Sequence, residues 1–175
     1  LHILHALAAE GHDLVGLGLR PPSDDVPASL KYIQYSLQRG NAKDVHPWAL
    51  DLESKVLRGE ACARAAAELK ASGFAPDLIC GHPGWGETLC LGDVWPDVPL
   101  LTYQEFFYQS HGFDSHFDSE MQPEPDWQST ARLHLKTANT LLNLERSRWC
   151  ITPTHFQRSS FPQRWHSQIS VIHDG

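Results

Sequence analysis

The sequence has 175 residues, which fits one domain of ordinary size that can bury its core without disulfides or metals. Fourteen Lys and Arg against 21 Asp and Glu give a formal net charge of −7, which argues against a nucleic-acid binder or a polybasic membrane surface. No apolar run approaches the roughly 20 residues of a membrane span. The 41% of hydrophobic residues is typical of a globular protein.

The first half of the chain predicts helices alternating with short strands. Residues 1–9 repeat Leu and Ala at helical spacing, and Gly11 suits the left-handed position after a helix. Residues 13–17 and 30–35 predict strands, and residues 47–72 predict a long helix. An open α/β sheet normally has a strand before such a first helix, so we expect the first strand to lie outside this chain.

The second half continues the alternation. Residues 76–81 and 98–103 predict short apolar strands, and residues 111–125 look irregular. Asp126 can cap a helix. Strands at 149–152 and 169–173 complete the set. The apolar stripe expected along the capped helix consists of Trp127, Ala131, Leu135, Ala138 and Leu142.

Short strands of almost continuous hydrophobicity between helices indicate a parallel sheet covered on both faces. We therefore predict one α/β domain over residues 1–175, with a Rossmann-like, doubly wound parallel sheet. Ligands bind such folds beyond the carboxyl ends of the strands. This rule directs attention to residues 80–87 and 103–108, which would share one cleft if their strands are neighbours.

Residues 82–87 read His-Pro-Gly-Trp-Gly-Glu. Gly84 and Gly86 give Gly-x-Gly, but Leu89 occupies the third glycine position of the dinucleotide fingerprint, which argues against nicotinamide binding. The glycines favour a close approach to the backbone, either by a ligand or by the next helix. Glu87 would then fall in the first turn of that helix, either as an acid favoured by the helix dipole or as a substrate contact.

His82, at a strand end, can donate to or accept from a sugar or phosphate oxygen, although a lone histidine is often structural. Glu105 is either a paired structural acid or a ligand acceptor. We take these two as candidate catalytic residues. Aromatic side chains nearby either stack on sugar rings or belong to the core. The candidate substrate-binding residues are Gly84, Trp85, Gly86, Glu87, Tyr103 and Tyr108.

Metal and thiol chemistry have little support. Residues 111–118 bring His and Asp close together but match no zinc pattern, so we expect a solvated loop and no metal or other cofactor. No Gly-x-Ser-x-Gly elbow of an α/β-hydrolase is present. The cysteines form no Cys-x-x-Cys pair and lie among apolar or small residues, which favours buried, reduced thiols of a cytosolic protein. They are Cys62, Cys80, Cys90 and Cys150.

Four stretches, which span almost the whole chain, resemble the N-terminal domain of bacterial retaining glycosyltransferases of family 4. They are residues 9–15, residues 76–87 with the HPGWGE motif, residues 103–108 with the EFFY motif, and residues 152–162 leading into 169–175. The resemblance implies the N-terminal half of a GT-B fold, in which two Rossmann-like domains face each other across a cleft. The C-terminal domain would follow residue 175.

The resemblance also implies a function. The N-terminal half would bind the acceptor, a glycan or lipid-linked glycan of polysaccharide biosynthesis, and the absent half would bind the nucleotide-sugar donor. Transfer of a hexosyl group would retain the anomeric configuration without a chelated metal. The protein would be cytoplasmic, with peripheral contact at the inner membrane left open and no nucleic-acid partner. These 175 residues alone would be inactive.

One departure from the family pattern leaves a choice open. Many family 4 members have a histidine near the strand end at Tyr103, where it contacts the donor sugar, whereas this chain has Gln104 and Glu105. Either Glu105 replaces that contact or His82 takes it over.

Other functions are also compatible with the sequence. They are a non-catalytic sugar- or protein-binding module, another GT-B enzyme such as a nucleotide-sugar epimerase or a phosphorylase, and a metal-dependent hydrolase.

Overall fold

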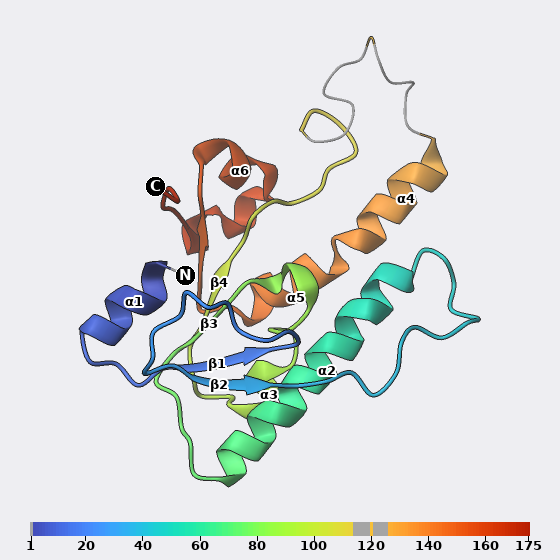
Figure 1. Cartoon of the computed structure of the whole chain (residues 1–175). Coiled ribbons are helices and arrows are strands. Elements are labelled where there is room, and N and C mark those ends of the chain that lie inside the picture. The colour runs from blue at the N-terminus through green and yellow to red at the C-terminus, as the bar shows by residue number, and fades with distance from the viewer. Residues whose placement is uncertain (1, 114–119, 121–125) are drawn as a thin grey trace.

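The computed structural model describes residues 2–113, 120 and 126–175. Its six strands form two sheets, and every pairing between them is parallel (Figure 1). One sheet pairs β1 (Val15–Gly18) with β2 (Lys31–Gln34). The other follows chain order through β3 (Ile79–Gly81), β4 (Leu100–Tyr103), β5 (Trp149–Thr152) and β6 (Ile169–Val171).

The predicted parallel α/β architecture is confirmed, but the expected single sheet is divided in two. Within the described residues, no strand bridges β1 and β3, so the two sheets are joined through side-chain packing instead. Val15, Leu17 and Ile33 pack against the buried cluster that includes Ile79 and Leu100. The first core therefore lies between the two sheets and the helix that connects them.

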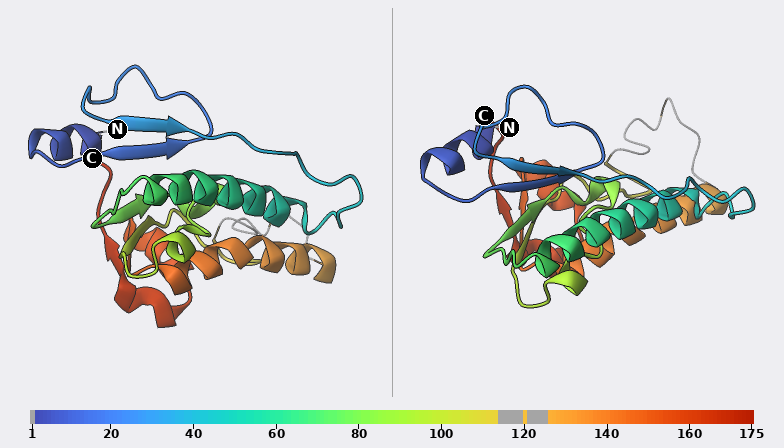
Figure 2. Two further views of the ribbon diagram at one scale, coloured as in Figure 1. Left: turned by 90° about the horizontal axis from the view of Figure 1, so that it is seen from below. Right: turned by 60° about the horizontal axis from the view of Figure 1, so that its bottom comes forward.

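The described helices follow the predicted alternation. Helix α2 (Leu50–Ala71) contacts β1 and the helices α4 (Trp127–Lys136) and α5 (Ala138–Arg146). The left view of Figure 2 shows α2 between the β1–β2 pair and these two helices. None of the helices in the described part of the chain combines the length and the apolar character needed to cross a bilayer. The α-helices are α1 (His2–Ala9), α2 (Leu50–Ala71), α3 (Leu91–Val94), α4 (Trp127–Lys136), α5 (Ala138–Arg146) and α6 (His155–Ser160); the 3-10 helices are η1 (Pro83–Trp85) and η2 (Gln163–Gln168).

Small residues let α2 approach its neighbours closely. Ala61, Cys62 and Ala66 are buried in the first core. A Cβ atom at Gly59 would lie 2.8 Å from the carbonyl oxygen of Gly86, closer than any side chain tolerates. The glycine at 59 therefore allows the loop after β3 to rest directly on α2.

The helix after residue 126 differs from the prediction in its buried face. Asp126 does cap α4, because its carboxylate accepts the Ser129 N–H at 2.7 Å, and this bond lowers the pKa of Asp126. The expected apolar stripe is wrong: Trp127 is 71% exposed, and Leu142 is 55% exposed. The helix divides at Thr137, and its buried side carries hydrogen-bonded polar residues, which an apolar pattern cannot reveal.

The four cysteines are free, but they are not all buried. Cys62 and Cys150 are buried, Cys90 is half-buried and Cys80 is exposed. Cys80 lies in β3 next to buried Ile79, and successive side chains of a strand point to opposite faces. The expectation of a buried thiol is therefore wrong at position 80.

Candidate functional site

The structure brings the two candidate catalytic residues together. Strands β3 and β4 are direct neighbours, with Gly81 opposite Thr102, so their carboxyl ends meet at one edge of the sheet. His82 follows β3, and Glu105 lies just beyond β4. The His82 Nε2 atom lies 3.4 Å from Oε2 of Glu105. The strands are therefore neighbours, the condition on which the expectation of a shared site depended.

The imidazole of His82 is held in one orientation by the loop that follows it. The Gly84 N–H donates to Nδ1 of His82 at 3.0 Å. Because Nδ1 is an acceptor, the neutral ring carries its proton on Nε2, the nitrogen that faces Glu105. A Cβ atom at Gly84 would lie 2.6 Å from Cε1 of this ring. Because Gly84 has no side chain, the imidazole of His82 can lie directly against the Gly84 backbone.

Tyr103 supports the other side of this arrangement. Its ring stacks on that of His82, with centroids 5.7 Å apart and an interplanar angle of 29°. Its hydroxyl donates to both carboxylate oxygens of Asp174, at 2.9 and 3.1 Å. Burial, followed by the Asp174 carboxylate, raises the pKa of Tyr103 to about 12. We refer to His82, Tyr103, Glu105 and Asp174 as the His82 cluster.

The His82 cluster is open to solutes. The side chain of His82 is 38% exposed and that of Glu105 is 66% exposed. Gln104 is only 1% exposed, and its amide donates to the Thr102 hydroxyl at 3.0 Å. Of Gln104 and Glu105, the two residues that follow β4, only Glu105 reaches the surface.

Trp85 is the most exposed aromatic residue of the loop after β3. Its side chain is 62% exposed, and the guanidinium carbon of Arg58 lies 5.5 Å from its ring centroid. Trp85 therefore offers an accessible aromatic face one turn beyond His82. An indole in this setting can stack on the apolar face of a sugar ring.

Gly86 and Glu87 are engaged inside the protein. Gly86 has a φ of 102°, and a Cβ atom there would lie 2.3 Å from the carbonyl oxygen of Lys55. The glycine therefore allows the loop after β3 to approach the backbone of α2 closely. Glu87 accepts the Tyr35 hydroxyl at 3.0 Å and lies 3.7 Å from Arg58. Burial and the Glu87 carboxylate raise the pKa of Tyr35. Both residues hold the loop against α2 and the end of β2.

Tyr108 lies outside the His82 cluster. The ammonium group of Lys136 lies 3.9 Å from its ring centroid, and the Phe106 ring is 6.1 Å away. One face of the Tyr108 ring is therefore covered by a helix α4 side chain. Tyr108 borders a pocket that is described below.

A buried polar network that the sequence did not indicate holds the loop after β3. Asn139 of α5 donates to the Pro83 carbonyl at 2.8 Å, and Asn143 donates to the carbonyl oxygen of Asn139 at 2.8 Å. Thr88 donates to the side chain of Asn143. Each side chain is at most 3% exposed. The network fixes the peptide next to His82 because unpaired buried polar groups are costly.

Asp174 is another residue that the sequence analysis missed. It follows β6, so the rule that drew attention to the ends of β3 and β4 applies to it equally.

Among the residues that the structure describes, no group of three or more His, Cys, Asp or Glu side chains could hold a metal ion. Residues 114–118 of the His-Asp run lie outside the described residues.

The geometry suits recognition of hydroxyl groups. The Nε2–H of His82 is a donor and the Glu105 carboxylate is an acceptor, and both are exposed at the same sheet edge. An aromatic face at Trp85 follows in the same loop. Such a set can bind a polyhydroxylated ring by hydrogen bonds at its edge and by stacking on its apolar face.

Comparisons with known proteins show the family and the fold of the chain. The model of the glycosyl transferase family 4 group matches residues 10–175. Among solved structures, the fold is similar to a UDP-glucosyltransferase from Polygonum tinctorium capable of glucosylating indoxyl, in complex with 3,4-dichloroaniline. The TM-score is 0.51, the identity is 11%, and the match covers 89% of this chain and 44% of that one. The comparison with curated proteins gave no match.

The structural likeness confirms the predicted Rossmann-like half of a glycosyltransferase fold. This chain spans less than half the length of that enzyme. The family model covers nearly the whole chain, including the loop after β3 and the end of β4. The chain belongs to the glycosyl transferase family 4 group.

Proposed function

We propose that this chain is the acceptor-binding half of a retaining glycosyltransferase, which transfers a hexosyl group from a nucleotide-sugar to a glycan or lipid-linked acceptor. The observation that carries the proposal is the exposed pair of His82 and Glu105, 3.4 Å apart at the adjoining ends of β3 and β4. Membership of the glycosyl transferase family 4 group supports the reaction class.

In this proposal, each member of the site has a defined task. His82 donates a hydrogen bond from Nε2 to a hydroxyl of the transferred sugar or of the acceptor, and Glu105 accepts a hydrogen bond from a hydroxyl of the same ligand. Trp85 stacks on the ring. Tyr103 is a positioning residue, since its ring supports the imidazole and its hydroxyl is already bonded to Asp174.

The proposed reaction is a front-face displacement. The bond between the anomeric carbon and the diphosphate oxygen breaks, and a bond from the acceptor oxygen forms on the same face of the sugar. The acceptor proton passes to the departing diphosphate oxygen, so no strong base is required of this chain. Catalysis by these residues then consists of positioning and of hydrogen bonds to the developing charge.

The donor would be held by a C-terminal domain beyond residue 175, and the isolated chain would not turn over a nucleotide-sugar. A lipid-linked acceptor at the cytoplasmic face of the inner membrane would find apolar side chains beside the site. The rings of Phe106 and Phe113 lie 6.2 and 5.6 Å from that of Phe156, which is 54% exposed. This aromatic group supports an acceptor with an apolar part.

The test is product analysis with the full-length natural protein. Radiolabelled UDP-, GDP-, ADP- and dTDP-hexoses are incubated with oligosaccharide and lipid-linked acceptors, and products are separated and examined by NMR. We expect labelled acceptor with the anomeric configuration of the donor. Consumption of no donor, or conversion to an isomeric nucleotide-sugar alone, would contradict the proposal, the latter in favour of an epimerase. An inverted product would contradict the retaining mechanism.

A further inference from the structure

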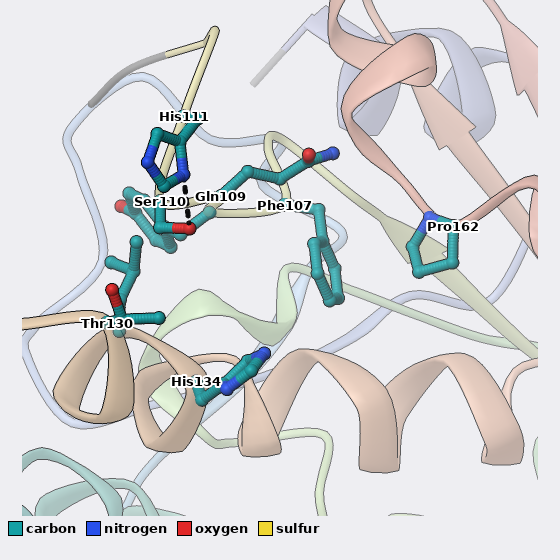
Figure 3. Close-up of a pocket in the computed structure, with 9 residues that line it drawn as sticks. Phe107, Gln109, Ser110, His111, Thr130, His134 and Pro162 are labelled. Carbon is teal, nitrogen blue, oxygen red and sulfur yellow. Dashed lines mark hydrogen bonds between the residues drawn. The ribbon is translucent and has the colours of Figure 1, made fainter. Parts of the chain in front are cut away.

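A pocket of about 380 Å³ opens beside the segment that follows β4 (Figure 3). Residues 107–111 form one side of it, Thr130, Leu133 and His134 of α4 form another, and Pro162 completes the described lining. None of these residues belongs to the His82 cluster. The volume lies within the roughly 300–1,000 Å³ that is usual for pockets that bind small ligands.

The walls of this pocket are fixed by contacts within the protein. The Phe107 N–H donates to the Ser160 hydroxyl at 3.0 Å, and the Gln109 amide donates to the Ser160 carbonyl. The Phe107 ring also lies 5.8 Å from the buried ring of Phe161. These contacts tie the segment after β4 to the end of α6, so this wall is formed before any ligand binds.

The lining combines hydroxyl, imidazole and aromatic groups. Thr130 and His134 are four residues apart and therefore lie on one face of α4, and Figure 3 shows both beside the cavity with Phe107 across from them. The Ser110 hydroxyl lies 2.9 Å from Nδ1 of His111. Such groups donate to and accept from hydroxyls while the aromatic rings cover an apolar surface.

The charges around the pocket indicate what kind of ligand it suits. The nine described lining residues include no Asp, Glu, Lys or Arg. Phosphate and carboxylate ligands are usually held by Arg or Lys, and cations by carboxylates. The ammonium group of Lys136 lies over the Tyr108 ring, and Lys136 is not among the described lining residues. An uncharged ring that carries many hydroxyls, a neutral sugar, fits this lining best.

The pocket lies within reach of the His82 cluster along the same segment. Glu105 and Phe107 are separated by two residue steps, which span at most about 7 Å of extended chain. An oligosaccharide with one ring at Glu105 can therefore place an adjoining ring in the pocket. We propose that this pocket binds a neutral, non-reacting sugar residue of an oligosaccharide acceptor; this assignment rests on the proposed function.

The experiment uses the full-length natural protein and a panel of neutral disaccharides: maltose, cellobiose, lactose and mannobiose. Binding is detected by saturation-transfer NMR and quantified by calorimetry. Thr130→Phe fills the pocket, and His134→Ala removes an exposed ring with little risk to folding. The matched control is Gln128→Ala, because exposed Gln128 lies about 200° around α4 from Thr130.

We expect at least one disaccharide to bind the wild-type protein and the control equally, and to bind Thr130→Phe and His134→Ala about tenfold more weakly. Binding of none of the four, or affinities that both pocket variants leave unchanged, would overturn the proposal. Displacement of the disaccharide by inorganic phosphate would also overturn it, in favour of an anion site.

Turnover of labelled nucleotide-sugar, measured with the oligosaccharide and lipid-linked acceptors of the product assay, separates this proposal from the proposed function. Donor consumption without a pocket-dependent disaccharide affinity refutes the pocket alone. Pocket-dependent binding without consumption of any donor refutes the transferase and leaves a sugar-binding site.

Discussion

Replacement of Gly84 by alanine tests the His82 cluster without removing any of its functional groups. The added Cβ would lie 2.6 Å from Cε1 and 2.9 Å from Nδ1 of His82, whereas unbonded carbon atoms prefer about 3.5–4.0 Å. The imidazole must therefore move by about 1 Å or rotate away. Either movement breaks its bond from the Gly84 N–H and changes its 3.4 Å approach to Glu105.

The expected consequence is a loss of catalysis with little loss of stability. A displacement of about 1 Å in a positioned group can cost about a hundredfold in rate, and we expect kcat/KM to fall by about tenfold to a hundredfold. The lost hydrogen bond costs about 1 kcal/mol, and the reduced freedom of the unfolded chain offsets about 0.4–1 kcal/mol of this. The unfolding free energy should therefore change by less than about 1 kcal/mol.

The assay is sugar transfer by the full-length protein under subsaturating donor, with urea unfolding measured on the same preparations. Gly40→Ala is the matched control, because a Cβ atom at Gly40 meets nothing within 4 Å. It should leave kcat/KM within about twofold of the wild type. If Gly84→Ala keeps more than about a third of the wild-type kcat/KM, the imidazole orientation has no part in function.

Three further predictions concern the surroundings of the site. Asn139→Ala leaves the buried Pro83 carbonyl without its donor and should lower the unfolding free energy by about 1–3 kcal/mol. The change is read from the urea midpoint at constant m, and the control Gln128→Ala should change the unfolding free energy by less than about 0.5 kcal/mol. Equal midpoints for the two variants would contradict the role of the bond between Asn139 and Pro83. Because burial and the Asp174 carboxylate raise the pKa of Tyr103, its neutral form contributes stability below its ordinary pKa, and this contribution is lost as pH rises through about 12. An absorbance titration of wild type minus Tyr103→Phe should show that midpoint, and Asp174→Asn should lower it. A midpoint near the ordinary tyrosine value of 10.0 in the wild type would contradict the described burial and hydrogen bond of Tyr103 together. Iodoacetamide at neutral pH should modify exposed Cys80 before buried Cys62, because burial raises the pKa of the Cys62 thiol to about 12. Peptide mass spectrometry gives the order of modification, and the reverse order would contradict the described packing of β3.

The proximity of His82 and Glu105 could be predicted from the sequence because both residues follow strand ends. The apolar runs that end at Gly81 and Tyr103 are short and distinct, and parallel neighbouring strands bring their carboxyl ends together. Only the adjacency of the two strands had to be assumed. The same rule applies to Asp174, because it follows β6. Its contact with Tyr103 could not be predicted from local patterns, because the two residues are distant in the chain.

The rest of the fold depends on long-range pairing and on buried polar groups. Nothing in the local pattern of residues 13–35 shows that β1 and β2 form a sheet of their own. The face of α5 that packs inward carries Asn139 and Asn143, while Leu142 is exposed. An apolar periodicity does not select these amides, because the partners that make their burial favourable, among them the Pro83 carbonyl, come from another segment.

The most direct test of the account is kcat/KM for sugar transfer by His82→Ala and Glu105→Gln in the full-length protein. If the imidazole and the carboxylate hold the sugar or the acceptor, each change should lower kcat/KM by about tenfold or more. Losses below about threefold for both variants, in proteins whose unfolding midpoints match the wild type, would remove these residues from the site.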